Sequence, residues 1–149
     1  MKRKLGYLIV IAAMLLVPAE GIDVGRLQPV EVVSILEKED GIRIQTDTGN
    51  VGRGMDLKEA YEDMKTAASG EVFLDTAEYL ILEGEITDKE MLLRYFRPKT
   101  RVCKAVGEID MEKAAQYLAV HKPEKCLKDI NAGDELQELR QKGPGFSLS

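Results

Sequence analysis

A predicted β-hairpin is the feature that most constrains the fold of this chain. VEVVSILE at residues 30–37 is β-branched and mostly apolar, and IRIQT at residues 42–46 alternates apolar and polar side chains with a period of two. Glu39-Asp40-Gly41 stands between these runs, and Asp-Gly is a preferred pair for a tight hairpin turn. The fold is therefore expected to begin with two antiparallel strands.

Three helices are predicted after the hairpin, with a strand before the second and another before the third. Each helix begins at an N-cap residue whose side chain accepts hydrogen bonds from the first turn, and continues with apolar residues at three- and four-residue spacing. The expected N-caps are Asp56, Thr87 and Asp110. Strands are expected within 72–82 and at 101–106. The order β-hairpin-α-β-α-β-α predicts a small mixed α/β, or α+β, domain with helices packed on a small mixed sheet.

The N-terminus is typical of an exported protein. Lys2-Arg3-Lys4 precedes an uncharged, mostly apolar stretch at 5–17, which is shorter than the ~20 residues of a membrane-spanning helix. Val17-Pro18-Ala19 then offers a cleavage site. We expect residues 1–19 to be an export signal cleaved after Ala19, with an uncleaved N-terminal membrane anchor as the alternative. The protein is then extracytoplasmic, either secreted or membrane-associated.

The rest of the chain is expected to form one domain. Residues 20–29 are interpreted as a connector, and residues 30–130 as a single α/β domain. A weaker helical pattern runs from Glu124 to Lys142, so a C-terminal helix and a flexible tail are predicted within residues 131–149.

Charge and metal-ligand composition exclude several classes of partner. The chain has 21 basic and 26 acidic residues, and removal of residues 1–19 takes away three basic and no acidic ones, which changes the net charge from −5 to −8. Phosphate backbones repel such a protein, so no nucleic-acid partner is expected. His121 is the only histidine and no C-x-x-C pair accompanies it, so neither a metal site nor a cofactor is predicted. Export permits a disulfide between Cys103 and Cys126, but two free thiols fit the sequence equally well.

Asp47-Thr48-Gly49 matches the tripeptide of aspartic proteases, and Asp75-Thr76 is a second Asp-Thr pair. The protease chemistry needs two carboxylates that share one proton in a rigid setting. Here polar residues surround the tripeptide and a predicted helix separates the two pairs. Gly49, Gly52 and Gly54 lack the Lys-Ser or Lys-Thr that follows a phosphate-binding loop. We therefore interpret this segment as a structural turn.

The remaining motifs together resemble the N-terminal domain of the spore-germination receptor C-subunit family, exported lipoproteins of spore-forming Firmicutes. The similarity is carried by GID at 21–23, GMDLKEA at 54–60, TAEYLILEGE at 76–85 and LLRYFRPKTRV at 92–102, and it extends to about residue 130. The chain departs from the family in two respects. No Cys stands near residue 20 to accept lipid, and the family continues into further domains.

The resemblance implies a non-enzymatic subunit at the outer face of a membrane, with integral-membrane protein partners. The leading hypothesis is an exported, non-catalytic interaction or scaffold domain of a sporulation or germination envelope complex. The alternative is an extracytoplasmic small-ligand-binding or adaptor domain unrelated to spores. An enzyme is the third class, and its remaining polar candidates have plainer structural roles as turn, strand-edge or helix-end residues. These candidates are Asp47, Asp75, Glu78 and His121.

A basic cluster on this acidic chain is the candidate site for partner binding. It consists of Arg94, Arg97, Lys99 and Arg101. The plainer interpretation is a solvated face around the end of a helix. The functional one is contact with an acidic patch on a protein partner or with anionic lipid headgroups.

Overall fold

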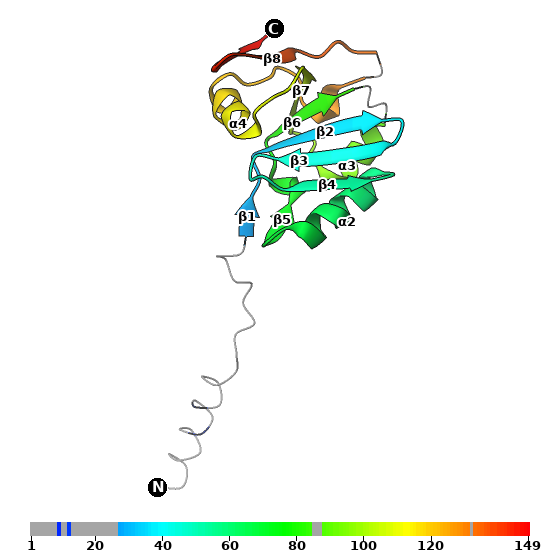
Figure 1. Cartoon of the computed structure of the whole chain (residues 1–149), viewed down its shortest axis with the longest axis vertical. Helices are drawn as coiled ribbons and strands as arrows, with labels where there is room; N and C mark the ends of the chain where they lie inside the picture. Colours follow the sequence, from blue (N-terminus) through cyan, green and yellow to red (C-terminus); the bar gives the residue numbers. More distant parts are fainter. Residues whose placement is uncertain (1–8, 10–11, 13–26, 85–87, 132) are drawn as a thin grey trace.

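The computed structural model describes residues 9, 12, 27–84, 88–131 and 133–149 (Figure 1). Nearly all of the predicted export signal and the connector up to residue 26 therefore lie outside the described residues, and so does the expected N-cap Thr87. Within these ranges no helix is long and apolar enough to cross a bilayer.

Seven strands form one mixed sheet in the order β4-β3-β2-β6-β7-β8-β9. Strands β2, β6, β7 and β8 run parallel to one another, whereas β3, β4 and β9 are antiparallel to their neighbours at the two sides. The strands are β2 (Val32–Lys38), β3 (Gly41–Thr46), β4 (Val51–Gly54), β6 (Tyr79–Glu83), β7 (Arg101–Val106), β8 (Glu138–Lys142) and β9 (Gly145–Leu148). A separate parallel pair joins β1 (Leu27–Pro29) to β5 (Glu71–Phe73).

Three α-helices cover this sheet from both sides. They are α2 (Leu57–Ala67), α3 (Lys89–Tyr95) and α4 (Met111–Val120), with the short 3₁₀ helices η2 (Leu74–Thr76) and η3 (Leu127–Asp129) in the connections. Helices α2 and α3 share one apolar core with the sheet, and α4 forms a second core on the opposite face. The structure confirms the predicted fold class, a mixed α/β domain that starts with a β-hairpin.

The helix starts agree closely with the predicted caps. Asp56 and Asp110 are the N-caps of α2 and α4, and their carboxylates accept hydrogen bonds from the backbone N–H groups of Glu59 and Lys113. At α3 the prediction of Thr87 was wrong by one residue: the N-cap is Asp88, which accepts from the N–H of Met91. A carboxylate suits this position because the first-turn N–H groups lack partners and carry partial positive charge.

The prediction of a C-terminal helix was wrong. Residues 138–142 and 145–148 are strands β8 and β9, which extend the sheet beyond the expected domain end at residue 130. A turn at Gly143, whose φ is +58°, connects the two strands. In β8 only Leu139 is fully buried, so the alternation that identifies a strand is nearly absent from the sequence.

Strand β4 was also missed, and it explains the glycines in GNVGRG. Helix α2 packs directly against the face of β4 that carries Gly52 and Gly54. A Cβ atom at Gly52 would lie 2.6 Å from the Cβ of Met64, and one at Gly54 would lie 2.7 Å from the carbonyl carbon of Glu59. Both glycines therefore serve close helix–strand contact rather than phosphate binding.

The Gly52→Ala variant tests this contact. The added methyl group would overlap the backbone of α2, so we expect the free energy of unfolding to fall by at least about 2 kcal/mol. Chemical denaturation of the full chain measures it. Gly145→Ala is the matched control, because a Cβ at Gly145 meets no atom closer than the Lys142 carbonyl oxygen at 3.7 Å. Equal losses in the two variants would contradict the close-contact explanation.

Candidate functional site

Asp47 anchors the backbone at the start of β2. Its Oδ1 atom accepts hydrogen bonds from the N–H groups of Glu31 (3.2 Å) and Val32 (3.3 Å). Within the same turn the hydroxyl groups of Thr46 and Thr48 lie 2.8 Å apart, and the Gly49 N–H donates to the Thr46 carbonyl at 3.1 Å. This geometry is that of a polar turn.

The second Asp-Thr pair acts on the same stretch of backbone. Thr76 Oγ1 lies 3.3 Å from the Val30 nitrogen and 3.2 Å from the Val30 carbonyl oxygen. Among the described residues, no hydrogen bond joins the carboxylates of Asp47 and Asp75. Burial raises the pKa of Asp47, and the backbone N–H groups of Val32 and Glu31 oppose that rise. Asp47 and Thr76 thus fix the junction between β1 and β2.

Three of the four predicted basic residues line one groove. Arg97 and Lys99 lie in the loop after α3, and Arg101 begins β7. Lys122, which follows α4, completes a groove of about 200 Å³ that we call the basic groove. Its remaining lining residues are Ala77, Glu78, Tyr79 and Thr100. Arg94 is exposed on α3 and does not line it.

A buried threonine holds the loop that carries the groove. The Thr100 hydroxyl donates to the Ala77 carbonyl at 3.2 Å, and its N–H donates to the Arg97 carbonyl at 3.0 Å. Arg101 Nη1 donates to the Pro123 carbonyl at 2.6 Å, which ties the start of β7 to the segment after α4. The sequence alone does not predict that Lys122 lies beside Arg97, because the two residues are far apart in the chain. Only the β6-α3-β7-α4 topology brings them together. The only sequence signal for this contribution of Lys122 is its position immediately after a helix end.

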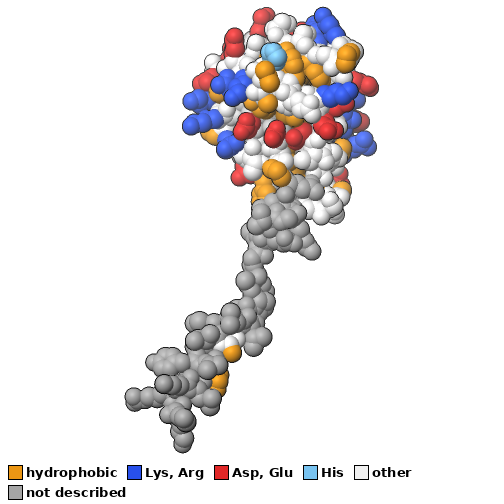
Figure 2. All heavy atoms as spheres, turned by 90° about the vertical axis from the view of Figure 1, so that its left-hand side faces the viewer, with side chains coloured by type: hydrophobic (Ala, Val, Ile, Leu, Met, Phe, Trp, Pro, Cys, Tyr) orange, Lys and Arg blue, Asp and Glu red, His pale blue; other side chains and the backbone are white. Residues whose placement is uncertain are grey.

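The basic groove holds its charge without ion pairs. In the described part of the chain, none of Arg97, Lys99, Arg101 and Lys122 forms a salt bridge. Glu78 is the single carboxylate in the lining. Burial raises the pKa of Tyr79, which Glu78 raises further and Arg101 lowers. Figure 2 shows the left-hand side of Figure 1, on which α4 lies: Asp and Glu cross the middle of this side, and Lys and Arg occupy its flanks.

An acidic hollow of about 690 Å³ lies at the other end of α4. Glu108, Asp110 and Glu112 line it together with Asp47 and Gln45. Asp110 is committed to capping α4, and Lys113 lies 3.9 Å from its carboxylate. No three carboxylate, His or Cys side chains among the described residues are placed to hold a metal ion.

The remaining polar candidates occupy structural positions. His121 is the C-cap of α4, as expected for a helix-end residue, and its ring stacks on Tyr117 with centroids 4.4 Å apart. Both cysteines are free thiols: Cys103 is buried, Cys126 is half-buried, and burial raises the pKa of Cys103 to about 12.

Comparisons with protein-family models, with curated proteins and with solved structures return no match. The geometry of the molecule is therefore the basis for assigning its function.

The raised pKa of Asp47 predicts a specific pH dependence. The folded state retains the Asp47 proton above the ordinary pKa of 3.8, where the unfolded chain has lost it. We therefore compare the free energy of unfolding of the wild type with that of Asp47→Asn. The wild-type value minus the variant value should fall as pH rises from 3.8 through the folded pKa. Denaturation of both proteins between about pH 3 and pH 6 measures the difference. A difference that is flat, or that rises with pH, would contradict the burial of this carboxylate.

Proposed function

We propose that this protein is an exported, non-catalytic interaction domain, in which the basic groove binds an acidic patch on a membrane-protein partner. The observation that carries the proposal is a cluster of four cations that form no salt bridge with any described residue, on a chain of net charge −5. In line with the resemblance to germination-receptor C subunits, the proposed setting is a sporulation or germination envelope complex.

The shape and chemistry of the groove favour a macromolecular surface over a small ligand. Small-molecule sites typically measure about 300 to 1,000 Å³, and this groove is smaller, at about 200 Å³. Arg97 and Arg101 each donate one hydrogen bond to a backbone carbonyl, of Thr76 and Pro123 respectively, and keep further guanidinium N–H groups that can bind a carboxylate. Lys99 and Lys122 add flexible point charges around them. An acidic surface patch satisfies all four groups together.

The alternative proposal, an extracytoplasmic small-ligand-binding or adaptor domain, is favoured by the acidic hollow. Its volume of about 690 Å³ falls within the usual range for ligand sites. A ligand there would carry positive charge, because Glu108 and Glu112 line the hollow. Saturation of this hollow by a cationic small molecule would raise the melting temperature of the protein.

Charge reversal in the groove tests the leading proposal. The Arg97→Glu, Lys122→Glu double variant should lose co-purification with membrane-protein partners from mildly solubilised native membranes, by about tenfold or more, because like charges then face the acidic patch. Quantitative mass spectrometry of the purified complexes measures the recovery.

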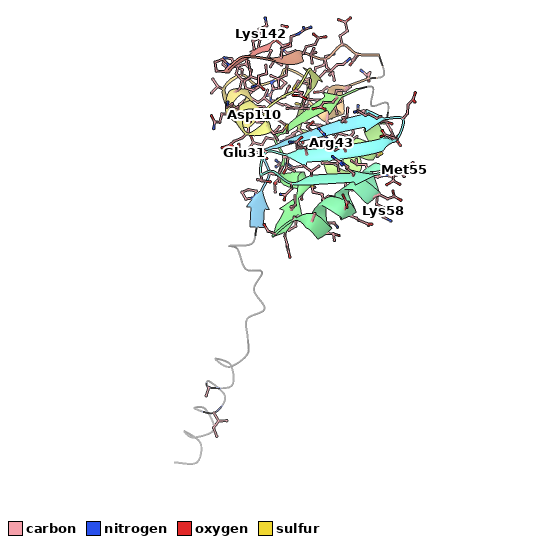
Figure 3. All side chains as sticks on the ribbon, viewed as in Figure 1. Glu31, Arg43, Met55, Lys58, Asp110 and Lys142 are labelled. Atoms are coloured by element: carbon pink, nitrogen blue, oxygen red, sulfur yellow. The ribbon has the colours of Figure 1, made fainter. Side chains whose placement is uncertain are left out.

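Lys58→Glu with Lys142→Glu is the matched control, since it changes the net charge equally at two sites that lie far apart in Figure 3. Unchanged recovery with the groove variant, at unchanged melting temperature, would refute the proposal. Retained partner recovery combined with lost binding to anionic vesicles would instead assign the groove to lipid headgroups.

A further inference from the structure

One face of the sheet is covered over only part of its width. Helix α4 packs on the face formed by Val32 of β2, Tyr79 and Ile81 of β6, and Cys103 of β7. The same face continues across β3 and β4, because Leu36 pairs with Arg43, and Arg43 pairs with Arg53. In Figure 1 this part of β2, β3 and β4 has no helix in front of it. We call it the open strip.

Two arginines stand opposite each other on the open strip. The Thr46 N–H donates to the Asn50 carbonyl, so these two residues form a hydrogen-bonded pair. From this pair onward, opposite residues of β3 and β4 alternate between non-hydrogen-bonded and hydrogen-bonded pairs. Arg43 and Arg53 form a non-hydrogen-bonded pair, which brings their side chains closest together. The Arg53 N–H points outward accordingly and donates to Asp63 Oδ2 at 2.9 Å.

Neither of these two charges has an ion-pair partner among the described residues. Like charges directly opposite on neighbouring strands destabilise a sheet. In the described residues neither arginine forms a salt bridge, and the only side-chain partner of Arg43 is Gln45 Oε1 at 3.4 Å. Glu83, in the same cross-strand row, accepts a hydrogen bond from the Ser34 hydroxyl at 2.9 Å. The arginines thus carry charge that the domain itself does not use.

The open strip also has a hollow and exposed apolar side chains. A depression of about 480 Å³ is lined by Leu36, Lys38, Arg43, Arg53 and Met55. Asp40 and Glu59 also line it, so three cations and two carboxylates face this hollow, and Glu59 Oε2 is held in place by the Met55 N–H at 2.9 Å. Met55 is 72% exposed and Val51, at the edge strand, is 38% exposed. Arginine and methionine beside apolar side chains are enriched at protein interfaces.

We propose that the open strip binds an acidic amphipathic helix of a partner protein. Three strands span about 10 Å from axis to axis, which matches the 10 to 12 Å diameter of a helix with its side chains. The rest of this face is already covered in this way by α4. Leu36 and Met55 meet the apolar side of the docked helix, and its carboxylates pair with Arg43 and Arg53.

The apolar N-terminal segment of the chain itself, residues 1–17, does not fit the open strip. That segment has the apolar character but carries Lys2, Arg3 and Lys4 and no acidic residue, so its charge repels the arginines. The same strip on a second copy is excluded for the same reason, because four arginines would then face one another. This leaves an acidic helix, of a different protein, as the occupant that fits both the charge and the width.

The test uses two synthetic amphipathic helices of about four turns. One has Leu on its apolar side and Glu on its flanks, and its twin has Lys in place of every Glu. Each is titrated into the ¹⁵N-labelled full chain in neutral detergent micelles. The acidic peptide should shift the amide resonances of β2, β3 and β4, and the basic twin should not.

Arg43→Gln with Arg53→Gln should weaken binding of the acidic peptide by at least about tenfold. The same variant should not lower the melting temperature, because it relieves the like-charge pair. Lys128→Gln with Lys142→Gln, an equal charge change at two exposed positions that line neither the open strip nor the basic groove, should bind the peptide like wild type.

Four results would overturn the proposal. The first is equal binding of the two peptides, and the second is unchanged affinity after both arginines are replaced. The third is a concentration-dependent shift of the same strands without peptide, which would show a second copy to be the occupant. Resonance shifts confined to the basic groove would likewise assign the acidic helix to the other surface.

Discussion

The central strands β2 and β6 set the requirement that organises the rest of the molecule. Both are buried on their two faces: Val32, Val33, Ser34 and Ile35 are all buried in β2, and β6 is buried from Tyr79 to Leu82. A strand of this kind needs a helix layer on each side of the sheet. Three helices meet that need over the centre, with α2 and α3 on one face and α4 on the other.

The same arrangement determines which surfaces stay free. Two helices, α2 and α3, cover one face of the sheet, so the cover extends to the edge strand β4. Gly52 and Gly54 permit the close contact between α2 and this strand. Only α4 serves the other face, and it lies over β2, β6 and β7. The uncovered strip over β3 and β4 thus follows from the number of helices. At the ends of the strands, Asp47 and Thr76 hold the junction that leads into β2.

The elements that were predictable from sequence are those with local signals. The hairpin follows from Asp40-Gly41 and from alternation in β3, and α2 and α4 follow from Asp56 and Asp110. Strand β4 escaped prediction because VGRG carries two glycines, which are poor strand formers selected here by the approach of α2. Strands β8 and β9 lie at the side of the sheet and bury few side chains, so tertiary pairing determines them.

The candidate site was also predictable only in part, for the residues that lie close together in sequence. Arg97, Lys99 and Arg101 lie close together in sequence and line one groove. Arg94 belongs to the same run but lies on the exposed side of α3, and a charge run alone does not report which way each side chain faces. Lys122 joins the groove only through chain topology. The Arg43–Arg53 pair had no sequence signal, because the partner strand β4 had not been recognised.

The two basic surfaces differ in rigidity, and this difference separates their roles in binding. Arg43 and Arg53 project from paired strands, so little backbone conformational entropy remains to be lost there when a partner docks. Arg97, Lys99 and Lys122 lie in connections between elements, outside the hydrogen-bonded ladders of the sheet. Exposed charges on a chain of net charge −5 attract an acidic partner only at short range, within the screening length of about 8 Å at physiological salt. The open strip is therefore suited to selecting one partner geometry, and the basic groove to strengthening an encounter in a salt-dependent manner.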